Sequence, residues 1–228
     1  MLKSALNVNN NNTTIILTST VNVNLNKAYV FQTNINDRIE TYLKSILQWL
    51  NKTNFNIILV ENSGYNFNEL NKEKQIYKDR FEVITFIENE LEEAQYLKNN
   101  VSKGDSEIFS INYAFNQSTI IKNSNFIIKI TARFYIDELE NYLNQFDLDK
   151  YDCLTQNNRG RCELVGSHYN FFSFIFNKNL IYEDKYYTGH IEYCWMTRAS
   201  KCNNILVCKE FKIDKTQRGG LDECFSNI

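Results

Sequence analysis

Proline is missing altogether from the 228 residues of this chain, and glycine occurs only seven times. The lack of proline accompanies an abundance of Asn, Ile and Lys, which indicates an AT-rich coding sequence rather than a physical requirement. The shortage of glycine bears on function. No G-x-G-x-x-G follows any expected strand, which argues against dinucleotide-dependent redox chemistry. Residues 18–26 contain no glycine, which argues against the Gly-rich phosphate loop of a sugar nucleotidyltransferase.

Metal-binding cysteine motifs are absent as well. None of the six cysteines shows C-x-x-C spacing, which weakens a zinc interpretation. The amino terminus lacks the charged-then-apolar pattern of a signal peptide. We therefore expect free, mostly buried thiols, as in a reducing compartment, and a cytoplasmic protein.

Long apolar runs and strong charge are also lacking. The run FFSFIF (171–176) is far too short to span a bilayer, so no membrane span is expected. A formal net charge of −2 gives no long-range field to hold polyanions, so nucleic acid is not expected as a partner. A local basic pocket remains open, because one diphosphate needs only two or three cations.

What the chain does contain is enough apolar material for a core. Hydrophobic residues make up 43% of the sequence and aromatic residues 14%. This length and composition suit one α/β domain. The Asn-rich start predicts a flexible tail over 1–12, and the absence of internal repeats and Gly/Ser linkers predicts a single domain over 13–228.

Extended and helical patterns alternate along the chain. A β-branched run predicts a buried strand at 13–21, and apolar residues at helical spacing predict a helix over 37–52. Further strands are expected at 55–60, 81–87, 126–131, 151–156, 170–177 and 204–213. Further helices are expected at 67–80, 105–121, 136–146 and 188–199. This alternation favours a mostly parallel sheet with helices on both faces.

Polar clusters follow three of the segments that we expect to end at one edge of the sheet. The run FNIILV breaks into Glu-Asn-Ser-Gly at 61–64, and Lys103 and Gly104 open the helix expected next. The strand at 126–131 contains Lys129 near its end, and Arg133 follows it. Ligands in open α/β folds bind beyond the carboxyl ends of strands, and helix amino termini favour phosphate. The pattern predicts a site for a phosphorylated ligand.

The order of these segments resembles the GT-A class of nucleotide-sugar glycosyltransferases, over roughly residues 13–200. The resemblance rests on the strand-helix-strand opening, the E-N-S-G turn and the K-G-x-x-E segment at 103–107. It also rests on K-I-T-A-R-F-Y (129–135), which is similar to the K-x-T-G-R-Y element of some bacterial and viral sugar-transferase-like proteins. It implies a Rossmann-like GT-A fold and hexosyl transfer from a nucleotide sugar, UDP- or GDP-linked, to a hydroxyl of a glycan, protein or small molecule.

The resemblance assigns base and ribose contacts to the ends of the first two strands. The residues concerned are Thr18, Ser19, Thr20, Glu61, Asn62 and Ser63. A carboxylate accepts two ribose hydroxyls, and Ser or Asn can meet a base edge. The alternative is an ordinary β-turn that merely meets backbone demands.

The resemblance also places Lys103 near the donor phosphates, with Gly104 beside it and Glu107 near the sugar. The alternative is a helix amino terminus capped by Ser102 or Asp105, a pattern expected on stability grounds.

Lys129 and Arg133 lie where many members of the class carry an Asp-x-Asp metal motif. This departure puts a divalent metal (Mn²⁺ or Mg²⁺) in doubt. The charge of a leaving diphosphate must be stabilised by a metal or by fixed cations, and the planar fork of Arg133 suits phosphate oxygens. A later acidic run with Asp-x-Asp spacing, 147–149, follows a helix rather than a strand, and we interpret it as a solvated connection.

The candidate general base is Glu192, in the segment TGHIEYCW (188–195), with His190 as its orienting partner, a metal ligand or an alternative base. In the class resembled, an acidic residue late in the domain often takes the acceptor proton. The alternatives are a first-turn carboxylate for Glu192 and a surface or core imidazole for His190. The turn at 218–225 is left outside the site.

The competing interpretation is an inactive domain that binds nucleotides or glycans, which the missing Asp-x-Asp motif keeps open. The donor base, the acceptor and the oligomeric state are not determined by the sequence.

Overall fold

The computed structural model describes the residues 12–156, 163–179, 181–182, 185–186, 191–218 and 222–228. Apart from residue 12, the predicted amino-terminal tail lies outside them. In the part of the chain described, no helix combines the length and the apolar character needed to cross a bilayer.

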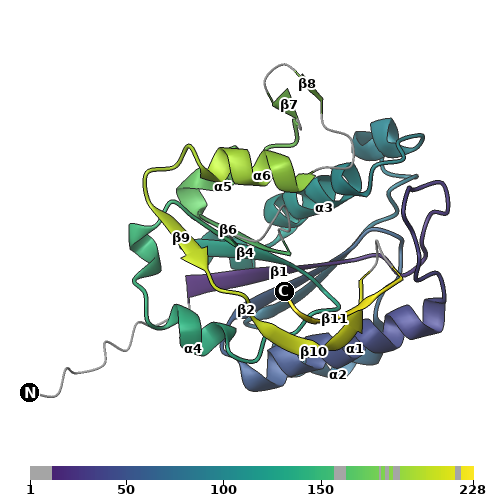
Figure 1. The fold of residues 1–228 in the computed structure, drawn as a ribbon. Coiled ribbons are helices and arrows are strands. Elements are labelled where there is room, and N and C mark those ends of the chain that lie inside the picture. Colours follow the sequence, from purple (N-terminus) through teal and green to yellow (C-terminus); the bar gives the residue numbers. More distant parts are fainter. Residues whose placement is uncertain (1–11, 157–162, 180, 183–184, 187–190, 219–221) are drawn as a thin grey trace, which may run out of the picture.

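Seven strands form one sheet that runs through the centre of the molecule (Figure 1). In order across the sheet they are β3 (Phe81–Thr85), β2 (Asn56–Glu61), β1 (Thr13–Ser19), β4 (Phe126–Thr131), β6 (Leu164–His168), β5 (Cys153–Gln156) and β9 (Ile205–Cys208). Strands β3, β2, β1 and β4 are parallel, and so are β5 and β9. Of the sheet strands described, only β6 runs against its neighbours, β4 and β5. The predicted mostly parallel sheet is confirmed.

Helices cover both faces of the sheet. They are α1 (Ile35–Lys52), α2 (Asn71–Ile76), α3 (Lys103–Gln117), α4 (Leu139–Leu143), α5 (Phe172–Ile175) and α6 (Ile191–Ala199). Short 3₁₀ helices occur at Asn68–Leu70, Glu92–Leu97, Ile120–Asn123, Leu148–Lys150 and Tyr169–Phe171. Two small antiparallel pairs complete the structure, β7 (Ile181–Tyr182) with β8 (Lys185–Tyr186) and β10 (Lys212–Gln217) with β11 (Cys224–Asn227).

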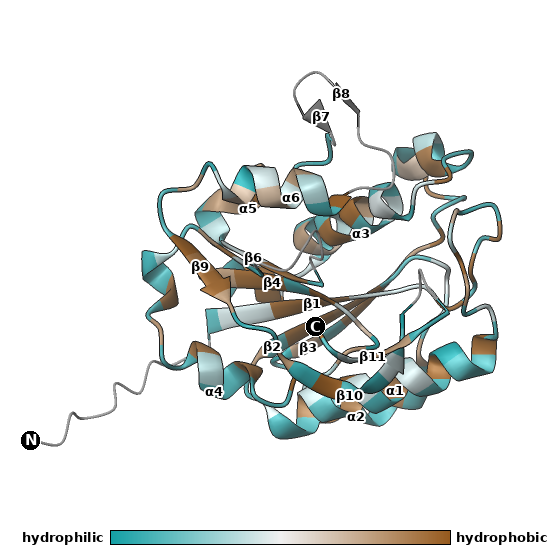
Figure 2. Ribbon diagram, viewed as in Figure 1, coloured by the Kyte–Doolittle hydropathy of each residue, from teal (hydrophilic) through white to brown (hydrophobic). Residues whose placement is uncertain are grey.

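The alternation of side chains along β1 divides the core between the two faces. Ile15 and Leu17 pack against α1 and α4, whereas Ile16 packs against α3, α5 and α6. Every residue of β1 is buried, as expected for a parallel strand covered on both sides. Figure 2 shows that the central strands are largely hydrophobic, whereas the helices also carry hydrophilic residues.

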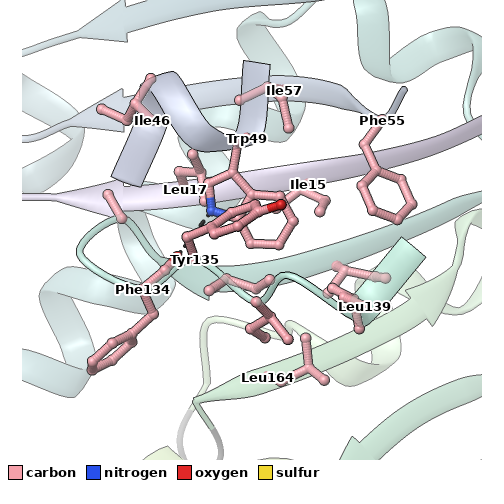
Figure 3. Close-up of a cluster of buried hydrophobic side chains, with 14 of the residues drawn as sticks. Ile15, Leu17, Ile46, Trp49, Phe55, Ile57, Phe134, Tyr135, Leu139 and Leu164 are labelled. Atoms are coloured by element: carbon pink, nitrogen blue, oxygen red, sulfur yellow. Dashed lines mark hydrogen bonds between the residues drawn. The ribbon is translucent and has the colours of Figure 1, made fainter. Parts of the chain in front are cut away.

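Trp49 of α1 anchors the first of these two cores (Figure 3). Its indole N–H donates to the carbonyl of Phe134 at 2.9 Å, and its ring meets Tyr135 edge-on at a centroid distance of 5.0 Å. Phe134 and Tyr135 follow β4 directly. The contact therefore fixes the chain just beyond Arg133, at the end of the strand where the candidate site begins.

One predicted strand is wrong. Residues 170–177 form a 3₁₀ turn and α5, because Phe172, Ile175 and Phe176 are buried at the i, i+3, i+4 spacing of a helix while Phe174 is exposed. The strand at this point of the chain is β6, just before it, which we did not predict. A Cβ on its Gly166 would lie 2.8 Å from the ring of Phe126, so the sheet requires the glycine that weakens the strand pattern.

The chain ends in a hairpin that returns to the sheet. Phe211 and Ile228 exchange two backbone hydrogen bonds, at 2.6 and 2.9 Å, and both side chains are buried in the core beside α1. Lys44 of α1 also pairs with Asp214 of β10 at 2.9 Å. The hairpin is thus held against the domain, which places Arg218, at the end of β10, beside the carboxyl ends of the central strands.

The expectation of free thiols agrees with the described residues. No disulfide joins Cys153, Cys194, Cys202, Cys208 or Cys224, and the first, second and fourth of them are buried.

Candidate functional site

A cleft of about 1090 Å³ opens at the carboxyl ends of β1, β2 and β4. The strand register places these ends side by side, because Ser19 pairs with Glu61 of β2 and Thr18 pairs with Thr131 of β4. The predicted residues that line the cleft are Thr18, Ser19, Thr20, Asn62, Ser63, Lys103, Gly104, Glu107, Arg133 and Glu192. Glu61 and Lys129 lie behind its surface, and His190 lies outside the described residues.

Glu61 is fully buried and organises the turn that follows β2. Its Oε1 accepts from the Val21 amide at 2.8 Å and from the Ser63 hydroxyl, and its Oε2 accepts from the amides of Ser63 and Tyr65 at 2.9 and 2.8 Å. These bonds occupy the acceptor positions of the carboxylate. In this arrangement Glu61 holds the loops around the cleft and is not presented to a ribose.

A second buried carboxylate, Glu88, lies in the cleft wall and was not predicted. It accepts from Asn62 Nδ2 at 3.1 Å and from Ser106 Oγ at 3.0 Å, and it pairs with Lys27 at 3.1 Å. Asn62 also accepts from the Thr20 hydroxyl at 2.6 Å. This network connects the loop after β1 with the ends of β2 and β3 and with α3. No local motif marks Glu88, because its partners lie at distant positions in the sequence.

Arg38 of α1 is a further buried cleft residue that sequence reasoning missed. It donates to the carbonyls of Thr20 and Gln32 at 2.7 and 2.8 Å and to the hydroxyl of Tyr42 at 2.8 Å. Arg38 therefore holds both ends of the loop between β1 and α1. Its position on the apolar face of a helix was the available signal, since an arginine there needs buried acceptors.

Glu107 of α3 faces the cleft beside the end of β1. Its Oε1 accepts from the Thr18 hydroxyl at 2.9 Å and pairs with Lys129 at 2.8 Å. The side chain of Lys129 is 2% exposed and lies over the ring of Trp195 at 4.9 Å. Lys129 therefore forms a buried ion pair with Glu107 and does not line the cleft as a phosphate ligand in this structure.

Lys103 and Gly104 form the amino terminus of α3, which Ser102 caps through a 3.2 Å bond from the Asp105 amide. Lys103 Nζ donates to the carbonyl of Tyr29 at 2.6 Å. Burial, and then the charge of Arg133, lower the pKa of Lys103, while Glu107 and Glu192 oppose the shift. A Cβ on Gly104 would lie 3.0 Å from Cβ of Ile191, so this glycine permits the close approach of α3 and α6.

Arg133 lies in the cleft just beyond β4, and its Nε is buried without a hydrogen-bond partner among the described residues. Its guanidinium carbon lies 5.7 Å from the ring centroid of Phe134. Buried donors are normally paired, so an orphaned arginine nitrogen at a cleft indicates a position for an anionic acceptor. The phosphate contact of Arg133 stays a prediction.

Arg218, which sequence reasoning left outside the site, also lines the cleft. It contacts Glu163 through Nε at 2.8 Å and Nη2 at 2.6 Å. Its charge also contributes to the lowered pKa of Lys103. Three cations, Lys103, Arg133 and Arg218, therefore join Lys27 and Arg38 in lining the cleft, although they come from α3, the segment after β4 and the carboxyl-terminal hairpin. Only the folded hairpin brings the third one there.

Glu192 lies in the first turn of α6, as predicted, and lines the cleft. Burial raises its pKa above the usual range, with Glu107 and Glu163 acting in the same direction and Lys129 against it. A carboxylate with a raised pKa accepts a proton more readily near neutral pH, which suits a general base.

The described residues of the cleft do not form a recognisable site for a divalent metal. Across the described ranges, no group of three or more His, Cys, Asp or Glu side chains is placed to hold an ion. The Asp-x-Asp sequence at 147–149 is outside the cleft, where Asp147 pairs with Lys150 at 3.3 Å and Asp149 accepts from Asn125 at 3.1 Å.

The chain matches no family model and no curated protein. Among solved structures, it is similar to a protein of Desulfovibrio desulfuricans G20 assigned as a nucleotide-diphospho-sugar transferase. The TM-score is 0.50 and the identity 12%, over 86% of this chain and 79% of the other. This likeness and the strand order show the architecture. The fold is of the GT-A type.

Two further solved structures match at a TM-score of 0.48 over 86% of this chain. One is S. aureus TarS, at 13% identity over 57% of that chain, and the other is the glycosyltransferase GlyE of Streptococcus pneumoniae TIGR4, at 9% identity over 45%. This chain therefore spans less than two thirds of the length of either protein.

Proposed function

We propose that this protein is a glycosyltransferase that moves a hexose-type sugar from a nucleoside diphosphate donor, UDP- or GDP-linked, to a hydroxyl of a glycan or protein acceptor. The observation that carries the proposal is the unpartnered Nε of Arg133, which shares a cleft with Lys103 and Arg218 at the carboxyl ends of parallel strands. Ligands of GT-A and other open α/β folds bind at this edge of the sheet. A diphosphate supplies the acceptor oxygens that Arg133 lacks.

The polar wall of Thr18, Thr20 and Asn62 is proposed to receive the nucleoside. These side chains surround the carboxyl ends of β1 and β2 and line the same cleft as the three cations. The wall is preorganised, because the Thr20 and Asn62 side chains bond to each other and Asn62 bonds to Glu88. A preorganised wall lowers the ordering cost of binding.

The chemistry proposed is a direct displacement that inverts the anomeric centre. Glu192 takes the proton of the acceptor hydroxyl while the hydroxyl oxygen bonds to the anomeric carbon. The bond between that carbon and the diphosphate oxygen breaks, and the electron pair leaves with the nucleoside diphosphate. Lys103 and Arg133 stabilise the growing negative charge, as fixed cations do in other phosphate-leaving reactions. The raised pKa of Glu192 and its place in the cleft support its role.

Isothermal titration with UDP, GDP, CDP and CMP tests the proposal. At least one nucleoside diphosphate should bind, and the corresponding nucleotide sugar should then be consumed in the presence of an acceptor. Binding to none of the four would overturn the proposed function. Binding without consumption of any nucleotide sugar would instead favour the inactive nucleotide-binding domain.

A further inference from the structure

The loop between β1 and α1 presents an aromatic side chain at the cleft in a strained backbone conformation. Tyr29 has a φ of 56°, in the left-handed region, which is rare for a bulky residue. The residue is 74% exposed to solvent. Phe67 is the other non-glycine residue with positive φ in the described chain, and it is fully buried against Tyr42 and Tyr65. Packing of its own side chain accounts for Phe67. It does not account for Tyr29.

The loop is held in place at several points, so the exposure of Tyr29 is part of a fixed arrangement. The Tyr29 carbonyl accepts from Lys103 at 2.6 Å, and the preceding amide, of Ala28, donates to the Val101 carbonyl at 2.9 Å. Lys27 pairs with the buried Glu88 at 3.1 Å. Strained residues persist where the surroundings over-determine them, and they gather at ligand sites.

Amide side chains line the same cleft as Tyr29. The segment V-N-V-N-L-N (21–26) alternates apolar and amide residues, and its Asn22 and Asn24 line the same cleft as Tyr29. Leu25, also 74% exposed, lies between Asn24 and Asn26. An aromatic face with adjacent amides suits a sugar, because the ring packs on the C–H face and each amide both donates to and accepts from hydroxyls. A lipid chain would need a continuous apolar surface, which the alternating amides interrupt.

We propose that Tyr29 and Asn22 form the acceptor subsite and that the acceptor is a carbohydrate chain. This inference rests on the proposed function and names the class of its second substrate. Tyr29 is continuous with the reacting centre through its bond to Lys103, which shares the cleft with Glu192. A saccharide on Tyr29 would therefore extend from the general base toward the outer edge of the cleft.

The test combines an array of defined oligosaccharides with titration of the free oligosaccharide that binds best, in saturating UDP or GDP. Tyr29→Ala should weaken that affinity about five- to tenfold, and Tyr29→Phe should retain most of it, because the ring supplies the contact. Asn22→Ala should weaken it about threefold, the value of one modest hydrogen bond. Phe31→Ala is the matched control, since Phe31 is 48% exposed on the same loop but does not line the cleft.

Nucleotide titration separates this inference from the proposed function. Tyr29→Ala should leave the affinity for the nucleoside diphosphate within about twofold of the parent. Saccharide binding that is insensitive to Tyr29→Ala, or binding of no saccharide by a protein that binds nucleotide, would overturn the inference alone. Binding to phosphatidylglycerol vesicles that Tyr29→Ala abolishes, without saccharide binding, would replace the carbohydrate with a lipid acceptor. A protein that binds no nucleotide would overturn the proposed function first.

Discussion

The two walls of the cleft differ in how completely the protein itself satisfies their polar groups. The wall at the end of β2, which we call the β2 wall, consists of Thr20, Asn62 and Glu88 with Glu61 directly behind them, and each of these residues hydrogen-bonds to a neighbouring loop or strand. The wall at the end of β4 consists of Lys103, Glu107, Arg133 and Glu192. There Arg133 Nε has no partner within the described chain, and burial shifts the pKa of both Lys103 and Glu192.

This difference separates residues that shape the cleft from residues that are available to bind and convert a ligand. Glu61 accepts backbone amides and Glu88 accepts side-chain donors from neighbouring segments, so both carboxylates fix loops and their removal should act on folding. The charged side chains of the β4 wall line the cleft, and Arg133 Nε has no hydrogen-bond partner among the described residues, so their removal should act on ligand binding and turnover. The contrast shows that a carboxylate at a strand end is no guide to function until its hydrogen-bond partners are known.

The largest expected effect falls on the β4 wall. Glu192→Gln should lower turnover by about a thousandfold, because loss of a positioned general base costs that order of magnitude, while nucleotide diphosphate affinity stays within about twofold. Steady-state kinetics with the best nucleotide sugar and titration of the diphosphate measure the two quantities. Turnover that survives the substitution would move the base elsewhere, first to His190.

On the β2 wall, Glu61→Gln should destabilise the fold by about 3 kcal/mol. The NH₂ group of the introduced glutamine would replace a carboxylate oxygen that accepts hydrogen bonds from backbone amides. Buried amide donors that lose their acceptor lower the free energy of unfolding. Urea unfolding followed by circular dichroism gives the change. Glu90→Gln is the control, because Glu90 is exposed and follows the cleft-lining residues Glu88 and Asn89. This substitution should change the free energy of unfolding by less than about 0.5 kcal/mol. Equal stabilities would show that the hydrogen bonds of Glu61 do not hold the loops around the cleft.

Arg133→Ala should weaken diphosphate binding by about ten- to thirtyfold and nucleoside binding by less than twofold, because a charged hydrogen bond to phosphate is lost. Arg133→Lys keeps the charge without the planar fork, so its affinity for the diphosphate should lie between those of the parent protein and Arg133→Ala. Lys122→Ala, an exposed cation on a 3₁₀ helix outside the cleft, should change neither affinity. Equal losses for nucleoside and diphosphate would contradict the phosphate assignment.

The smallest effect concerns pH. Burial raises the pKa of Glu192, so this carboxyl stays protonated to a higher pH than an exposed glutamate, whose pKa is about 4.3. A base acts only when deprotonated, so kcat/KM should fall as pH decreases through a pKa above that value. A pH profile at subsaturating acceptor measures it. An acid limb at or below the ordinary glutamate range would show that Glu192 does not carry the titration.

The amino-acid sequence by itself determined the layout of the molecule. Buried strands such as β1 and amphipathic helices such as α1 follow from local periodicity, and α3 follows from its Ser102 cap. Because parallel strands end at one edge of a sheet, strand-end positions sufficed to place Asn62 and Arg133 in one cleft. Glu192 was instead proposed from the resemblance to the GT-A class.

Tertiary structure decided what each of these residues faces. Glu61 accepts a hydrogen bond from Val21, and Glu88 pairs with Lys27, although both partners are distant in the sequence. Arg218 reaches the cleft only because the carboxyl-terminal hairpin folds back on the domain. Residues 170–177 became a helix because burial at positions i, i+3 and i+4 outweighed the strand preference of its aromatic side chains. Periodicity is a local property that one sequence records. Hydrogen-bond partners and burial arise between distant segments, and the fold alone brings those segments together.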